Sequence, residues 1–134
     1  MPTDGYAQYQ QNQLLSASPS KLLLAAYDGA IRFARIAGEK MKEQKLDEQS
    51  TYINKTLAIV FELISTLRED VDPLLVARLK SLYTYVIEKL AHANLNQDEE
   101  SLNEAINILS QLRETWAQAE KIIIEEQSAM EDAA

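Results

Sequence analysis

The stretch PSKLLLAAYDGAIRFARIAGEKMKEQ, residues 19–44, contains the pattern that decides the fold. It opens with proline directly after Ser18, the arrangement of a helix N-cap followed by proline in the first turn. Apolar residues then recur at alternating steps of four and three, which places them on one face of a helix. These residues are Leu23, Tyr27, Ala30, Ala34, Ala37 and Met41. The stretch therefore predicts one long amphipathic helix.

Three further segments have the same spacing and predict helices near 47–69, 73–95 and 99–126. Asp72-Pro73 repeats the cap and proline, and Asp98 precedes an acidic first turn. Asn94 suits the end of the third helix, because asparagine tolerates the left-handed conformation of a C-cap. The positions predicted to face the core are Ile53, Leu57, Val60, Ile64 and Leu67, then Leu75, Leu79, Leu82, Val86, Leu90 and Ala93, then Leu102, Ile106, Leu109, Leu112, Trp116, Ala119 and Ile123.

Four apolar stripes joined by short connections favour an all-α fold, an antiparallel up-down four-helix bundle in a single domain. We expect the bundle to span residues 18–127. Residues 1–17 contain glycine, proline and several glutamines and cannot form a core alone, so they predict an extended arm or a short helix. Its main apolar residues are Tyr6, Tyr9, Leu14 and Leu15. Residues 128–134 are small and acidic and predict a flexible tail.

Composition and charge exclude several classes of function. The chain has 21 acidic against 13 basic residues, a net charge of −8, and such a field repels nucleic-acid phosphates. No apolar run approaches the ~18 residues of a membrane span, so we expect no membrane insertion. The absence of cysteine excludes disulfides and thiolate metal sites.

Catalytic chemistry is also not predicted. The single histidine, His92, has Glu88 four residues before it, whereas a di-metal site in a helical bundle needs two Glu-x-x-His pairs. No glycine-rich loop is present to hold phosphate. We therefore predict no catalytic residue, metal or cofactor. A histidine phosphotransfer domain is an alternative, but those domains usually carry a basic residue and a glycine soon after the histidine. Here Ala93-Asn94-Leu95-Asn96 follows.

The helix at 19–44 carries more apolar surface than one bundle seam requires. Leu24 and Ile31 fall on one side of its stripe, and Leu22, Ala26 and Phe33 on the other. The second helix adds Tyr52, Ile59 and Leu63 on one flank. Neighbouring helices and the arm cover all of this surface in one interpretation. In the other, part of it forms grooves for a partner's amphipathic helices.

Four sequence blocks, in order, resemble the flagellin-specific export chaperones (FliS). They are Tyr6-Ala7-Gln8-Tyr9-Gln10-Gln11-Asn12 with Ser16-Ala17-Ser18-Pro19, then Leu23-Leu24-Ala25-Ala26-Tyr27-Asp28-Gly29-Ala30-Ile31, then Leu82-Tyr83-Thr84-Tyr85 with Ala93-Asn94-Leu95-Asn96-Gln97-Asp98, and Arg113-Glu114-Thr115-Trp116-Ala117-Gln118-Ala119. The resemblance spans residues 6–120. Two positions depart from the family pattern, which usually has an acidic residue at Thr84 and a basic one at Glu88.

The resemblance implies a chaperone of the bacterial cytoplasm that binds the C-terminal helical region of flagellin. Binding would prevent premature polymerisation and deliver flagellin to the cytoplasmic domain of the type III export gate. The residues it suggests for flagellin binding are Leu22, Leu24, Tyr27, Ile31 and Phe33. Those it suggests for contact with client or export gate are Tyr6, Tyr9, Leu14 and Leu15. Weak self-association and a generic helical adaptor remain open, and Tyr27 also fits a core position.

Overall fold

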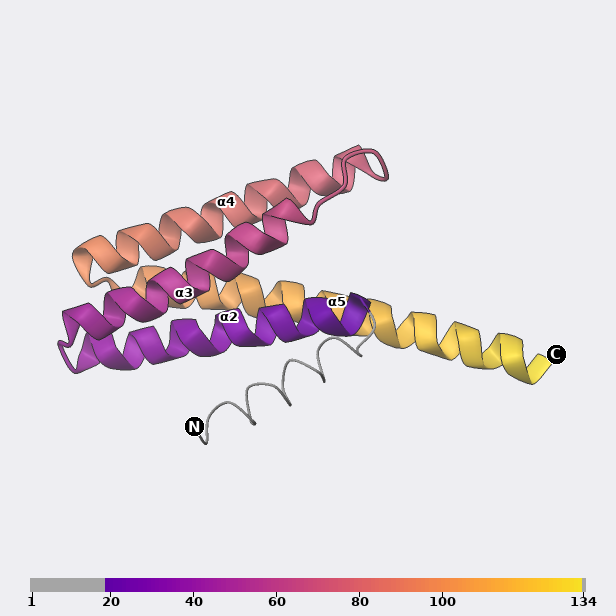
Figure 1. Cartoon of the computed structure of the whole chain (residues 1–134), viewed down its shortest axis with the longest axis horizontal. Helices are drawn as coiled ribbons and strands as arrows, with labels where there is room; N and C mark the ends of the chain where they lie inside the picture. The colour runs from indigo at the N-terminus through magenta and orange to yellow at the C-terminus, as the bar shows by residue number, and fades with distance from the viewer. Residues whose placement is uncertain (1–18, 134) are drawn as a thin grey trace, which may run out of the picture.

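The computed structural model describes residues 19–133, which form four helices (Figure 1). These are α2 (Pro19–Lys42), α3 (Leu46–Ser65), α4 (Pro73–Asn96) and α5 (Glu99–Ala133). α2 packs against α3 and α5, and α4 packs against α3 and α5, so the helices follow one another around an up-down bundle. Residues 19–133 contain no strand, and the predicted all-α fold is confirmed. The predicted arm, including Tyr6, Tyr9, Leu14 and Leu15, lies outside the described residues.

α3 is shorter than the predicted range of 47–69. Ser65 Oγ donates a hydrogen bond to the carbonyl oxygen of Glu62, and Thr66 Oγ1 donates to that of Leu63, both at 2.7 Å. These hydroxyl groups satisfy carbonyls of the last turn that a continuing helix would use. The helix therefore ends at Ser65, and a loop over residues 66–72 leads to α4.

The predicted caps of α4 and α5 are confirmed. Asp72 Oδ1 accepts a hydrogen bond from the backbone N–H of Leu75 at 3.1 Å. Asp98 Oδ1 accepts from the backbone N–H groups of Glu100 at 3.0 Å and Ser101 at 3.4 Å. Each aspartate satisfies amide donors that have no partner within the helix.

The prediction that Asn94 caps the third helix is wrong. α4 continues past it, and Gln97 takes the left-handed conformation instead, with φ of 51°. Asn94 Oδ1 accepts hydrogen bonds from Gln49 Nε2 at 2.9 Å and Ser50 Oγ at 3.1 Å. Asn94 therefore joins α4 to the first turns of α3, a long-range contact that the local sequence pattern does not reveal.

The core is built on the predicted stripe of α2. Its fully buried residues are Tyr27, Ala30, Ala34 and Ala37. Because interaxial distance depends on the side chains at the contact, the three alanines let α3 and α5 approach α2 closely. Larger side chains from the other helices fill the remaining space, among them Ile53, Val60, Val86, Leu90, Leu102 and Leu109.

The predicted stripe of the third helix is wrong at two positions. Leu75 and Leu82 are exposed, whereas their neighbours Val76 and Tyr83 are buried. Apolar residues stand at consecutive positions in both places, so the three-four spacing fits either choice. The buried Tyr83 side chain meets Tyr27 of α2, and this contact decides which face of α4 turns inward.

α5 extends past its predicted end at residue 126 and continues to Ala133. Its last part runs beyond the end of α2 and away from α3 and α4 (Figure 1). Ile123, predicted to face the core, is 50% exposed. That prediction is wrong because none of the other described helices, α2 to α4, accompanies α5 over this length.

Gly29 lies in the middle of α2, where glycine is less favourable than alanine. An added Cβ would lie 3.5 Å from Ile59 Cδ1, an ordinary van der Waals contact. We expect Gly29→Ala to raise the free energy of unfolding by about 0.5–1 kcal/mol, measured by urea denaturation. Gly38→Ala is the comparison, because its Cβ would meet buried Leu102 Cδ2 at 3.3 Å and should gain less. A less stable Gly29→Ala variant would contradict the prediction.

Candidate functional site

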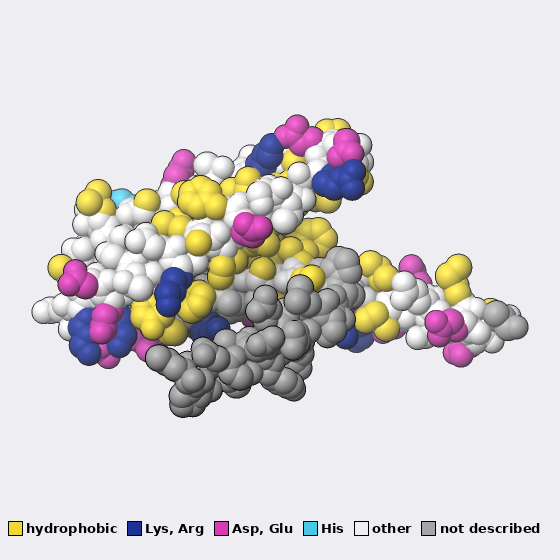
Figure 2. Space-filling view, viewed as in Figure 1, with side chains coloured by type: hydrophobic (Ala, Val, Ile, Leu, Met, Phe, Trp, Pro, Cys, Tyr) yellow, Lys and Arg dark blue, Asp and Glu magenta, His cyan; other side chains and the backbone are white. Residues whose placement is uncertain are grey.

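The bundle is open at one end. The second half of α3 and the first half of α4 diverge from α2 and α5 (Figure 1). Hydrophobic side chains lie between the diverging parts (Figure 2). This opening follows from the short α3 and the loop after it, which carry the chain away from α2.

Two adjoining pockets occupy the opening, and together we call them the open-end groove. The first has a volume of about 520 Å³ and is lined by Leu22, Leu23, Ala26, Ile59, Glu62, Leu63 and Thr66. The second has a volume of about 290 Å³ and is lined by Leu23, Thr66, Leu67, Arg68, Val71, Asp72, Leu75, Val76, Leu79, Tyr83 and Trp116. Because Leu23 and Thr66 line both pockets, the groove is continuous.

The groove is largely apolar, which distinguishes it from the other hollows. A more open hollow of about 780 Å³ lies beside Arg35 and the start of α5, but Glu99, Glu100 and Asn103 line it. Ligand and peptide sites are usually apolar with a few polar groups. The open-end groove is therefore the better candidate.

Three aromatic residues from three helices join beneath the groove, and we call them the aromatic cluster. Trp116 Nε1 donates a hydrogen bond to Tyr27 Oη at 3.2 Å, and the hydroxyls of Tyr27 and Tyr83 share a hydrogen bond. Burial, the main cause, raises the pKa of both tyrosines above the ordinary value. Because Tyr83 and Trp116 also line the groove, the cluster sets the position of its wall.

Two polar contacts hold α2 against α5 near the groove. Arg113 Nε donates to Asp28 Oδ1 at 2.9 Å, and this contact raises the pKa of the Arg113 guanidinium. Ser20 Oγ donates to Glu120 Oε1 at 3.3 Å. Asp28 is thus engaged by α5.

The structure separates the five predicted flagellin-binding residues. Leu22 lines the groove and is partly exposed. Leu24 is half-buried on the same helix. Tyr27 and Ile31 are buried in the core, so a direct contact with a partner would require the bundle to open. Phe33 lies outside the groove.

Phe33 belongs to a separate aromatic patch between α2 and α3. Its ring centroid lies 6.0 Å from that of Tyr52. Lys55 Nζ lies 5.4 Å from the Phe33 centroid and 5.1 Å from that of Tyr52, within cation–π range. Phe33 is therefore already partnered on its own side of the molecule.

Sequence reasoning did not assign the α3 and α4 sides of the groove. Ile59 and Leu63 stood out only as extra apolar surface. Val71, in the loop after α3, is 70% exposed and lines the second pocket. An apolar side chain between Asp70 and Asp72 was the local signal that could have found it.

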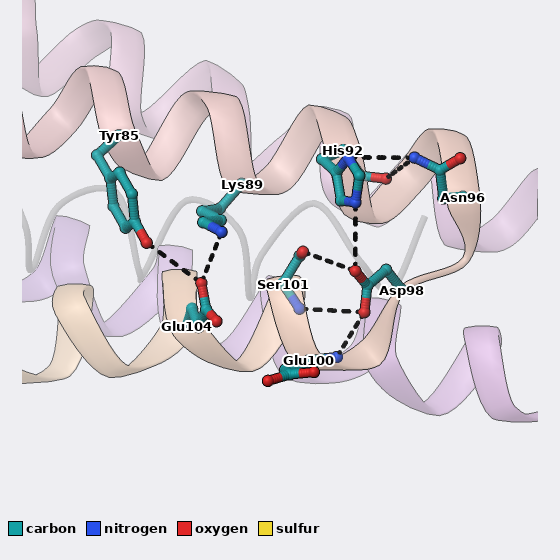
Figure 3. A network of polar contacts seen from close by, with 8 residues as sticks. All are labelled: Tyr85, Lys89, His92, Asn96, Asp98, Glu100, Ser101 and Glu104. Atoms are coloured by element: carbon teal, nitrogen blue, oxygen red, sulfur yellow. Dashed lines mark hydrogen bonds and ion pairs between the residues drawn. The ribbon is translucent and has the colours of Figure 1, made fainter.

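A polar network joins α4 to α5 on another face (Figure 3). Tyr85 Oη donates to Glu104 Oε2 at 3.2 Å, and Lys89 Nζ lies 2.8 Å from the same oxygen. The hydrogen bond between Lys89 and Glu104 raises the pKa of the Lys89 amine and lowers the pKa of the Glu104 carboxyl. Thr84 and Glu88, which depart from the family pattern, are exposed on α4.

His92 lies in the same network (Figure 3). Its Nε2 is 3.3 Å from Asp98 Oδ2, and Asn96 Nδ2 is 3.2 Å from its Nδ1. A carboxylate this close would repel an incoming phosphoryl group. The arrangement therefore disfavours the phosphotransfer alternative.

We expect the Asp98 carboxylate to contribute to stability in a pH-dependent way. Hydrogen bonds from Ser101 are the main cause that lowers the pKa of its carboxyl from the ordinary 3.8. A lowered pKa means that the carboxylate stabilises the fold above pH 3.8 and loses this effect as the pH falls through the lower, folded-state value. We expect Asp98→Asn to lower the urea midpoint at pH 7, and the difference from the parent chain to shrink below pH 3.8.

The control for Asp98→Asn is Glu88→Gln, which neutralises an exposed carboxylate elsewhere on α4. Asparagine is also a good N-cap, so the comparison isolates the charge of Asp98. If the difference in urea midpoint between Asp98→Asn and the parent chain stays the same from pH 7 to below pH 3.8, the charge of Asp98 does not stabilise the fold and the prediction is wrong.

Two negative observations apply to residues 19–133. They contain no cluster of three or more His, Cys, Asp or Glu side chains arranged to hold a metal ion. No helix among them has an apolar stretch long enough to cross a membrane.

Comparison with known proteins identifies the kind of molecule. The family model for the flagellar protein FliS matches residues 2–122, so the last residues of α5 lie beyond that match. A flagellar secretion chaperone FliS from Campylobacter jejuni is 35% identical over 83% of this chain and 87% of its own length. The Bacillus subtilis protein of that name is 30% identical over 85% and 84%. A crystal structure of a bacterial flagellar chaperone, 20% identical, shares the fold with a TM-score of 0.72, over 90% of this chain and 98% of that one.

Proposed function

Because the chain belongs to the FliS family of flagellar secretion chaperones, we propose that it binds the C-terminal region of flagellin in the open-end groove. The observation that carries the proposal is the groove itself, a continuous apolar channel between diverging helices. An amphipathic helix laid into such a channel would place side chains at i, i+3 and i+4 against it.

The groove suits a client that is disordered when alone and helical when bound. Ordering such a segment costs several kcal/mol, so the affinity must come from extensive apolar contact. A flagellin helix held in the groove would have its own apolar face covered. It would then be unable to pair with other flagellin molecules, and would remain ready for the type III export apparatus of the bacterial cytoplasm.

The predicted contact residues take different roles in this proposal. Leu22 lines the groove and would touch the client there, whereas Leu24 falls on the other side of the α2 stripe and would touch the client outside the groove. Tyr27 and Ile31 would support the groove from the core, and Phe33 would act on a separate face. The arm residues Tyr6, Tyr9, Leu14 and Leu15 would contact the client or the cytoplasmic domain of the export gate.

The test is isothermal titration of the full chain with a flagellin C-terminal peptide. A scrambled peptide of the same composition and an unrelated amphipathic peptide are the controls. We expect saturable binding of the flagellin peptide and a negative heat-capacity change, because apolar surface is buried. Equal affinity for the unrelated amphipathic peptide would favour the generic helical adaptor instead.

A further inference from the structure

The last part of α5 leaves the bundle as a single helix (Figure 1). Every residue from Lys121 to Ala133 is exposed. The Ser20–Glu120 hydrogen bond joins α2 to α5 just before these exposed residues. We call residues 119–133 the α5 extension.

The α5 extension carries an apolar stripe that continues the groove. Steps of three, four and seven from Trp116 place Ala119, Ile123 and Met130 on one helix face. Ile122 lies beside them, and both isoleucines and Met130 are half exposed or more. Trp116, which starts this face, lines the groove, so the stripe lies on the same face of α5 as the groove.

Acidic residues border this stripe. At 100° per residue, Glu120 and Glu131 fall on one side of the stripe and Glu125 on the other, and Glu126 falls between Ile122 and Met130. Figure 2 shows hydrophobic and acidic side chains together on the projecting part of the molecule. The one basic residue of the extension, Lys121, falls opposite the stripe.

We propose that the α5 extension is a docking surface for an amphipathic helix of a partner protein that carries Lys or Arg on both sides of its apolar stripe. The partner's apolar residues cover Ile122, Ile123 and Met130, and its basic flanks face the acidic borders. Opposite charges along the edges of two paired helices set partner choice. A second copy of this chain would bring like charges together along both edges, which disfavours self-pairing. This surface is separate from the flagellin contact proposed above.

The test uses the full chain and two designed helical peptides. Both have leucine at the a and d positions of a heptad repeat, with lysine at e and g in one peptide and glutamate in the other. By fluorescence anisotropy we expect the lysine peptide to bind at least ~10-fold more tightly, with an affinity that falls as salt screens the charges. Equal affinity for the two peptides would overturn the proposal.

Paired variants locate the binding. Ile122→Ser combined with Ile123→Ser should weaken the lysine peptide at least ~10-fold, since both side chains lose their apolar contact. Leu46→Ser is the matched control, because Leu46 is 52% exposed at the start of α3, against 50% for Ile123. Glu125→Lys with Glu131→Lys should reverse the preference toward the glutamate peptide. Retained binding of the lysine peptide by the isoleucine variant would place the site elsewhere.

Two further measurements distinguish the other occupants. Sedimentation at neutral pH should show the parent chain as a monomer. A dimer that is lost in the isoleucine variant would mean that a second copy of the chain occupies the extension, and would overturn the proposal. The isoleucine variant should also bind the flagellin peptide as the parent chain does. If the isoleucine variant loses flagellin binding, the extension is part of the client site, and the proposal of a separate surface is overturned. Flagellin binding by the groove itself is tested independently, with variants of groove residues.

Discussion

Replacing Leu22 by glutamate is expected to weaken flagellin binding by about 100-fold or more, with little change in stability. Leu22 lines the open-end groove and is 39% exposed, so the folded chain tolerates a charge there. A bound client helix would cover it. The variant loses the free energy of burying a leucine side chain, about 1.5–3 kcal/mol, and it also leaves a carboxylate beneath the bound client. A loss of ~2.7 kcal/mol already corresponds to a 100-fold weaker affinity.

The matched control is Leu82→Glu on α4. Leu82 is also 39% exposed but lines neither pocket of the groove, so the same substitution there should leave flagellin affinity unchanged. Titration calorimetry measures both affinities, and thermal unfolding checks that both variants fold. Equal loss of affinity in the two variants would mean that net charge, and not the groove, controls binding.

Replacing Tyr27 by phenylalanine is expected to lower the free energy of unfolding by about 2–3 kcal/mol. The Tyr27 hydroxyl meets both the Tyr83 hydroxyl and Trp116 Nε1. Its removal leaves two polar groups in a buried or half-buried position without their partner, at about 1–3 kcal/mol for each fully buried group. Tyr83→Phe removes one of these hydrogen bonds and should cost less. Urea denaturation of both variants measures the difference.

The double variant Tyr27→Phe, Tyr83→Phe sharpens this test. Replacing both members of a hydrogen-bonded pair removes the unpaired hydroxyl that the first substitution created. We expect the double variant to be more stable than Tyr27→Phe by about 1 kcal/mol, so that its effect is smaller than the sum of the two single effects, as happens for residues in contact. Strict additivity of the two single effects would contradict a direct interaction between the two hydroxyls.

The aromatic cluster also explains part of the family resemblance in physical terms. Tyr27, Tyr83 and Trp116 come from three different sequence blocks, and Asp28 and Arg113 add an ion pair between two of the same blocks. The blocks therefore meet one another in the core and at its edge. Sequence reasoning identified each block but did not connect them, because the contacts join residues 56–89 positions apart.

Several site assignments depended on surfaces that no single helix defines. The pattern on α2 correctly indicated surplus apolar surface near Leu22. It did not distinguish Leu22, which lines the groove, from Ile31, which is buried by neighbouring helices. Helical periodicity gives the direction of a side chain relative to its own axis, and it carries no information about where a neighbouring helix bends away.

The sequence alone determined the all-α class, the four helices, the caps at Asp72 and Asp98, and the family. All of these depend on local spacing and local hydrogen bonds, which lie within a few residues of one another along the chain. Only the tertiary structure decided which face of α4 turns inward, how Asn94 joins α4 to α3, where the bundle opens, and how far α5 extends from it. These features depend on packing between distant segments, where competing arrangements of the same apolar residues differ only in the contacts they make.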